Sequence, residues 1–110
     1  MTPQEINEAV ASKFGYSNFR IKQGLGSSYL VADKDGIGYP RKVPDYCTSI
    51  AAAWGIVEKC EGFRLYMKDG LWEAEIMVHL GNLDNINKWR EQGYTAPMAI
   101  CLAFLKLPIA

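Results

Sequence analysis

His79 is the only histidine of the chain, so every catalytic hypothesis that needs an imidazole base depends on it. It ends an alternating segment that also carries Glu73 and Glu75. Side chains two residues apart in a strand point to the same face of a sheet, so these three groups would lie on one face. Two carboxylates and an imidazole so arranged could bind a metal ion or act as acid and base.

The two glutamates also have simpler partners. If their segment pairs with the residues before it as a hairpin, Tyr66 lies opposite Glu73 and Arg64 lies opposite Glu75, and such cross-strand pairs stabilise a sheet. We therefore favour a solvated or lightly covered sheet face over a catalytic or metal site. The sequence predicts a protein that is not an enzyme and uses no metal and no cofactor. An enzyme acting through His79 and the two glutamates is the weaker alternative.

Two short motifs are typical of turns. Residues 33–36 (Asp-x-Asp-Gly) resemble the opening of a calcium-binding loop, but Pro44 occupies the position that should hold the final glutamate. Residues 24–26 (Gly-x-Gly) lack the third glycine and the strand–helix context of a dinucleotide fingerprint.

The segment from Asp33 to Cys47 is the longest predicted loop, and long loops in compact domains are often functional. It combines tyrosines with two adjacent cations, the residue types that stack on bases and hold phosphates. Four cations on predicted strands could extend this basic surface, although each is more simply an exposed strand position: Arg20, Lys22, Arg64 and Lys68. In the alternative interpretation the tyrosines pin the loop to the core and the cations are solvated. The predicted ligand-binding residues are Tyr39, Arg41, Lys42 and Tyr46.

Length and composition set the class of protein. The chain has 110 residues, 12 Lys or Arg and 12 Asp or Glu, and a formal net charge of zero. This predicts a single domain over residues 1–110 that can bury a core without a disulfide or a metal. The zero net charge argues against bulk nucleic-acid binding, which depends on cations that neutralise phosphates.

Cysteine usage indicates a reducing compartment. Cys47, Cys60 and Cys101 are odd in number and widely spaced, which suits neither a disulfide framework nor a metal motif. Cys60 and Cys101 fall in helical patterns and are predicted to be small buried hydrophobes. The chain shows no signal peptide, and its most apolar stretch, residues 98–107, is too short to span a bilayer. We expect a cytoplasmic protein with no membrane association.

The first half of the chain predicts a helix and a hairpin. Thr2 caps a helix that has Pro3 in its first turn and ends at Gly15. Residues 19–22 and 29–32 read as two strands joined by a Gly- and Ser-rich connection. The chain is then expected to be irregular as far as Cys47.

The second half predicts a better specified hairpin. A helix capped by Thr48 or Ser49 runs to Gly62 with Trp54 in its core stripe. The turn at residues 69–70 (Asp-Gly) then fixes the register of residues 63–68 against residues 71–80. The predicted opposite pairs are Met67 and Trp72, Leu65 and Ala74, Phe63 and Ile76, Tyr66 and Glu73, and Arg64 and Glu75.

The C-terminal part predicts a loop with a short helical turn around residues 84–92, followed by a helix capped by Thr95. Between residues 98 and 107 the only charged residue is Lys106. Because a helix that is apolar all round needs cover on more than one side, we expect a homo-oligomer that buries it. The predicted order is α-β-β-α-β-β-α, an α+β fold (an α/β sandwich) with a mainly antiparallel four-stranded sheet packed with helices.

Two stretches of sequence resemble a known family. They are VPDYCTSIAAAW at residues 43–54, continuing to VEK at residues 57–59, and GYTAPMAIC at residues 93–101. With the helix that enters Gly15, they resemble the phage ABA sandwich domain family and, more distantly, NinX-like phage proteins. The departures are Cys47 where a serine is expected and Ser49 where an acidic residue is expected. The resemblance covers nearly the whole chain and supplies no catalytic residues.

The resemblance implies a small accessory protein of a phage or prophage, acting in the host cytoplasm. We expect non-catalytic binding that sequesters a small phosphorylated or cyclic nucleotide signal of host antiphage defence. The alternative is a protein-interaction module that inhibits or recruits a host or phage replication or defence protein through its apolar C-terminal helix.

Overall fold

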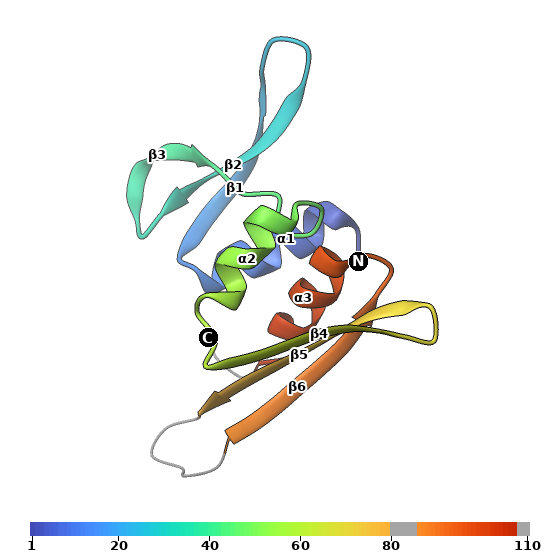
Figure 1. Cartoon of the computed structure of the whole chain (residues 1–110). Helices are drawn as coiled ribbons and strands as arrows, with labels where there is room; N and C mark the ends of the chain where they lie inside the picture. The colour runs from blue at the N-terminus through green and yellow to red at the C-terminus, as the bar shows by residue number, and fades with distance from the viewer. Residues whose placement is uncertain (80–85, 108–110) are drawn as a thin grey trace. The chain divides into compact units, whose positions relative to one another are not determined.

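The computed structural model describes residues 1–79 and 86–107 (Figure 1), except for the side chains of Ile37, His79, Ile86 and Asn87. The described part contains three helices and six strands in the order α-β-β-β-α-β-β-β-α. It forms two compact units, the first built from Met1–Pro44 and the second beginning at Asp45. The single domain over residues 1–110 stays a prediction.

Helix α1 (Pro3–Lys13) opens the first unit as predicted. The Thr2 hydroxyl accepts a hydrogen bond from the Glu5 N–H at 3.1 Å, and Pro3 occupies the first turn. The chain leaves the helix at Gly15, whose φ is +90°. The dihedral angle favours glycine, and a Cβ at this position, 2.2 Å from an Asp35 carboxylate oxygen, would also displace that side chain.

The sheet of the first unit has the order β1-β2-β3, with every neighbouring pair antiparallel. Strands β1 (Tyr16–Gln23) and β2 (Ser28–Lys34) confirm the predicted hairpin and extend it at both ends. Strand β3 (Ile37–Lys42) lies where an irregular loop was expected, so that prediction is wrong.

Pro40 does not prevent strand β3 from forming, because β3 lies at the edge of its sheet. Arg41 pairs with Ala32 and Ile37 pairs with Lys34, so the residues between them, Pro40 included, fall where the register shifts. An edge strand with a bulge tolerates a residue that has no N–H to donate.

Helix α2 (Ile50–Val57) opens with a Ser49 cap, whose hydroxyl accepts from the Ala52 N–H at 3.2 Å. It is shorter than predicted, so Cys60 lies in the turn after the helix and not within it. The expectation that Trp54 belongs to the core is also wrong, because its side chain is 47% exposed. Ala53 and Ile56 form the fully buried side of this helix instead.

The predicted register of the next hairpin is confirmed at every pair. Strands β4 (Gly62–Lys68) and β5 (Leu71–His79) place Met67 opposite Trp72 and Arg64 opposite Glu75, with the three pairs between and beyond them as expected. Asp69 and Gly70 have φ of 52° and 81°, the positive values that a type I′ turn requires at both positions.

Strand β6 (Ile86–Gly93) replaces the helical turn expected around residues 84–92; residues 80–85 lie outside the described part. It pairs with β5 so that Trp89 lies opposite Ile76 and Arg90 lies opposite Glu75. Polar side chains lie on both faces of this edge strand, with Lys88 and Arg90 on one face and Glu91 beside Trp89 on the other. Its hydrophobic alternation is therefore too weak to reveal a strand in the sequence.

Helix α3 (Ala96–Leu105) follows a Thr95 cap and contacts β5, β6 and α2 (Figure 1). The approach to β6 is close, because a Cβ at Gly93 would lie 2.7 Å from the Ala99 nitrogen. Six of the ten residues of α3 are buried within the chain. The expectation that its apolar circumference stays uncovered is therefore wrong, while the homo-oligomer itself stays a prediction.

The α+β class is confirmed. The four-stranded sheet is corrected to two three-stranded antiparallel sheets, because each predicted hairpin gains a third strand, β3 or β6.

Candidate functional site

Two of the four predicted ligand-binding residues lie on opposite faces of the first sheet. Arg41 lies opposite Ala32 and Lys42 lies opposite Val31, so these two consecutive side chains project from opposite faces of the sheet. Tyr46 belongs to the second unit and is only 7% exposed. Arg41 and Lys42 therefore do not act from one face of the sheet, and the ligand site of four residues stays a prediction.

One face of the first sheet gathers cations around a tyrosine. Lys22 lies directly opposite Tyr29, and Arg20 and Lys42 flank Val31, the next residue of β2 on that face. The Lys42 Nζ lies 5.7 Å from the centre of the Tyr29 ring, within the range of a cation–π contact. We call Arg20, Lys22, Tyr29 and Lys42 the cationic face.

Asp33 compensates the charge at one end of this face. Its carboxylate lies 3.2 Å from the Arg20 guanidinium and accepts a hydrogen bond from the Asn18 amide at 3.1 Å. The hydrogen bond from Asn18, followed by the contacts from Arg20, holds the pKa of Asp33 below its usual value. Lys22 and Lys42 form no ion pair within the described residues.

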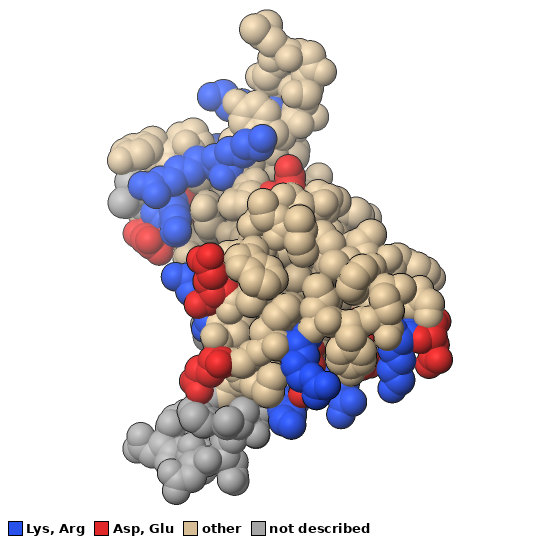
Figure 2. All heavy atoms as spheres, in the orientation of Figure 1, with Lys and Arg blue, Asp and Glu red and all other residues tan. Residues whose placement is uncertain are grey.

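The two remaining cations of this sheet also lie over tyrosines. The Arg41 guanidinium is 5.9 Å from the Tyr39 ring centre on the other face, and the Lys34 Nζ is 5.2 Å from the Tyr16 ring. Residues 16–42 carry five Lys or Arg and two Asp, a net charge of +3 in a chain whose total is zero. Figure 2 shows Lys and Arg side chains lying across the strands of this sheet.

The second sheet places its charges differently. Glu73 and Glu75, on the central strand β5, are only 6% and 4% exposed, so this face is more covered than the sequence suggested. The Tyr66 hydroxyl donates a hydrogen bond to Glu73, which is the main reason that the pKa of Tyr66 is raised. A Glu75 oxygen lies 4.0 Å from the Lys88 Nζ.

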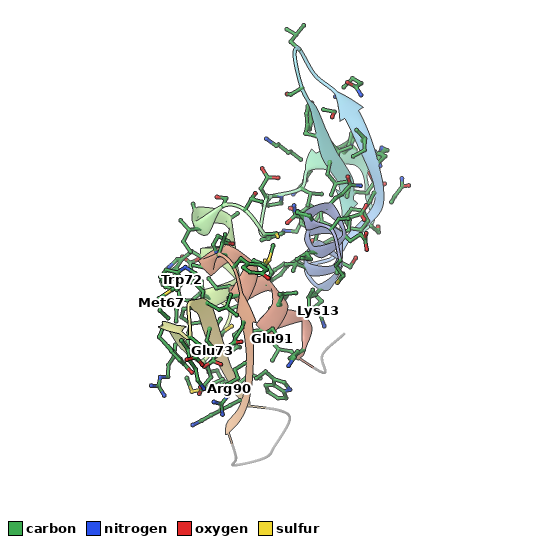
Figure 3. All side chains as sticks on the ribbon, turned by 90° about the vertical axis from the view of Figure 1, so that its right-hand side faces the viewer. Lys13, Met67, Trp72, Glu73, Arg90 and Glu91 are labelled. Carbon is green, nitrogen blue, oxygen red and sulfur yellow. The ribbon has the colours of Figure 1, made fainter. Side chains whose placement is uncertain are left out.

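Cations on both outer strands flank these carboxylates. Arg64 on β4 and Arg90 on β6 both lie opposite Glu75. Figure 3 shows Glu73 and Arg90 on this sheet, with Met67 and Trp72 beside each other toward the hairpin turn. The two glutamates thus have protein partners, as the cross-strand pairing predicted.

The remaining candidate groups for catalysis are His79 and the three cysteines. The His79 side chain lies outside the described part, so the triad of His79, Glu73 and Glu75 stays a prediction. Burial raises the pKa of Cys47 and Cys60, and burial together with the neighbouring Cys47 raises that of Cys101 to about 12. Because their pKa values are raised, these thiols stay protonated near neutral pH, whereas the reactive form of cysteine is the thiolate.

Neither a group of metal ligands nor a membrane-spanning helix occurs in the described part of the chain. No group of three or more His, Cys, Asp or Glu side chains there comes together as a metal site. Among the described helices, none has both the length and the apolar character needed to cross a bilayer.

The fold and the sequence together define the class of this protein. The phage ABA sandwich domain family matches residues 20–105, so the chain belongs to that family. A phage protein from Bacillus cereus ATCC 14579, known from a 2.0 Å crystal structure, is 28% identical with a TM-score of 0.63. The similarity covers 100% of this chain and 93% of that one. A comparison with curated proteins finds no match.

Sequence reasoning missed Tyr29 as a site residue and placed Arg41 with Lys42. The register of the first hairpin carried the missing signal, because it puts Tyr29 opposite Lys22. The placement of Lys42 needed β3, which the sequence did not predict.

Proposed function

We propose that the protein binds a small phosphorylated or cyclic nucleotide without catalysis, and that the cationic face holds it. The ammonium groups of Lys22 and Lys42 supply charged donors for phosphate, and the ring of Tyr29 between them offers a surface on which a base can stack. This set replaces the site of Tyr39, Arg41, Lys42 and Tyr46 expected from the sequence, of which it keeps Lys42.

The comparison between the two sheets carries this proposal. In the second sheet the outer strands carry Arg64 and Arg90, and the central strand supplies Glu75 between them. In the first sheet the outer strands likewise carry Lys22 and Lys42, but the central strand supplies an aromatic ring and no carboxylate between them. An anionic ligand would supply the missing negative charge.

Membership of a phage family supplies the context. A phage protein that binds a nucleotide signal and does not turn it over would lower the free concentration of that signal in the host cytoplasm. We therefore propose sequestration of a signal used by host antiphage defence. The other proposed function, a module that captures a host or phage protein through the C-terminal helix, loses its main support because that helix is buried.

The test uses two neighbouring residues as a matched pair. Lys42→Glu and Arg41→Glu make the same kind of charge reversal at adjacent positions, but on opposite faces of the sheet. Isothermal titration with cyclic dinucleotides, mononucleotides and an unphosphorylated nucleoside should find a phosphorylated ligand. Lys42→Glu should then weaken its binding about tenfold or more, and Arg41→Glu should change it less than about threefold, because charged hydrogen bonds contribute roughly 1.5–3 kcal/mol.

The opposite ranking of the two variants would place the ligand on the other face of the sheet. An absence of binding to every phosphorylated compound would overturn the proposed function.

A further inference from the structure

Strand β4 is an outer strand of the second sheet, and within the described residues it pairs only with β5. Residues of an antiparallel strand alternate between those whose backbone groups bond to the neighbour and those whose groups point away. Because Lys68 closes the two-residue turn, the even-numbered residues of β4 face β5. The N–H and C=O groups of Phe63, Leu65 and Met67 therefore point outward.

Exposed apolar side chains lie beside this open edge. Met67 is 54% exposed, and Ile50 and Trp54, one turn apart on α2, are 49% and 47% exposed. The Trp54 ring meets the Phe63 ring edge to face at 5.9 Å between centres, which places the exposed side of α2 next to β4. Proteins usually cover or charge a strand edge of this kind, because it is ready to pair with another strand.

We propose that β4 pairs with β4 of a second copy of this chain, antiparallel and about a two-fold axis at Leu65. The two three-stranded sheets would then form one six-stranded sheet. A two-fold interface of this kind uses the same patch on both copies, so the patch must be complementary to itself.

Three registers pair at least two of the residues whose backbone groups point outward, and the side chains select this one among them. A two-fold axis at Arg64 places this residue opposite the partner's Arg64. An axis at Tyr66 places Arg64 opposite the partner's Lys68. Both arrangements put like charges directly opposite, which destabilises a sheet. An axis at Leu65 avoids this problem.

With the axis at Leu65, each face of the joined sheet is complementary. On one face Phe63 lies opposite the partner's Met67, so Phe63 and Trp54 of each copy cover a methionine of the other. On the other face Arg64 lies opposite the partner's Tyr66, a favourable cation–π pair. Arg64 keeps its own compensating charge, because Glu75 lies opposite it on β5.

The first test measures the mass of the full chain by sedimentation and compares two variants. We expect twice the chain mass of 12.3 kDa for the unmodified protein. Met67→Glu should lose the dimer, because it places a carboxylate against the apolar side chains of the partner. Tyr94→Glu changes another exposed apolar residue of the same unit, 84% exposed after strand β6, and should leave the dimer unchanged.

The second test determines which residues of the two β4 strands lie opposite each other, and it does not depend on the stability of Met67→Glu. In a Cys60→Ser background, Leu65→Cys should cross-link on mild oxidation, because directly paired residues lie about 5.5 Å apart at Cα, within the disulfide range. Lys68→Cys lies on the same strand but opposite the partner's Gly62, so it should not cross-link. The proposal would be overturned if the unmodified protein were a monomer at all concentrations, or if Met67→Glu folded and still formed the dimer. Equal cross-linking of Leu65→Cys and Lys68→Cys would also overturn it.

Discussion

The two sheets share a topology and differ in how they balance charge. Each is a three-stranded antiparallel meander that follows a helix, and each contains an Asp-Gly turn with positive φ at both residues. The second sheet neutralises its outer cations with two buried glutamates on the central strand. The first leaves Lys22 and Lys42 around a tyrosine. The same backbone can therefore present a self-contained face or one that attracts an anion.

The sheets also differ in how they bury apolar groups, and a matched pair of isoleucine substitutions should give the largest effect. Ile76→Ala, at a fully buried site of the second sheet, should lower the free energy of unfolding by about 2–5 kcal/mol. Ile21→Ala, at a site of the first sheet that is 49% exposed, should lower it by less than about 1 kcal/mol, since it removes little buried area. Urea denaturation of both variants measures the difference, and equal effects would contradict the contrast between the sheets.

The two Asp-Gly turns allow a second matched comparison. Asp69→Ala with Gly70→Ala should destabilise the protein by about 1 kcal/mol or more, since both positions need positive φ. The same change at Asp35 and Gly36 should destabilise it less, because β3 keeps fewer regular pairs with β2 than β4 keeps with β5. Thermal unfolding gives both values, and an unchanged melting temperature for the first variant would show that its turn does not control the register.

The smallest effect concerns the ion pair between α3 and β6. The Lys106 Nζ lies 2.9 Å from a Glu91 carboxylate oxygen, and this contact, followed by the Gln92 N–H, lowers the pKa of Glu91. A carboxylate whose pKa is lowered on folding adds stability above its unfolded pKa and loses it as the pH falls through the folded value. Lys106→Met should therefore destabilise the protein by about 0.2–1 kcal/mol at pH 7 and by less at pH 3.

Melting temperatures of Lys106→Met and the unmodified chain at the two pH values check this. A difference that grows toward pH 3 would contradict the assigned ion pair. The Arg20 and Asp33 pair of the first sheet should show the same sign of pH dependence, because the pKa of Asp33 is also lowered.

The candidate site shows where sequence reasoning was limited. Arg41 and Lys42 are adjacent in sequence and were predicted to act together on a loop. Once β3 forms, the alternation of a strand sends them to opposite faces. Whether β3 forms depends on backbone hydrogen bonds to β2, and the composition of residues 37–42 does not reveal these bonds.

The Asp-Gly dipeptide occurs in both sheets but led to two different predictions. At residues 69–70 the flanking segments alternate cleanly, so the turn predicted a hairpin and its full register. At residues 35–36 the segment after the turn contains Pro40, and the sequence predicted only a turn. The difference lies in the flanking strand, since both turns have positive φ at the aspartate and at the glycine.

The sequence by itself determined the features that depend on neighbours within a few residues. Thr2, Ser49 and Thr95 cap their helices because each hydroxyl reaches an N–H three residues on. The turn at residues 69–70 sets its register through two local dihedral angles. Tertiary structure alone decided that edge strands β3 and β6 join their sheets, that Trp54 is exposed and that α3 is buried. Those outcomes depend on hydrogen bonds and packing between segments far apart in the chain, which local preferences do not specify.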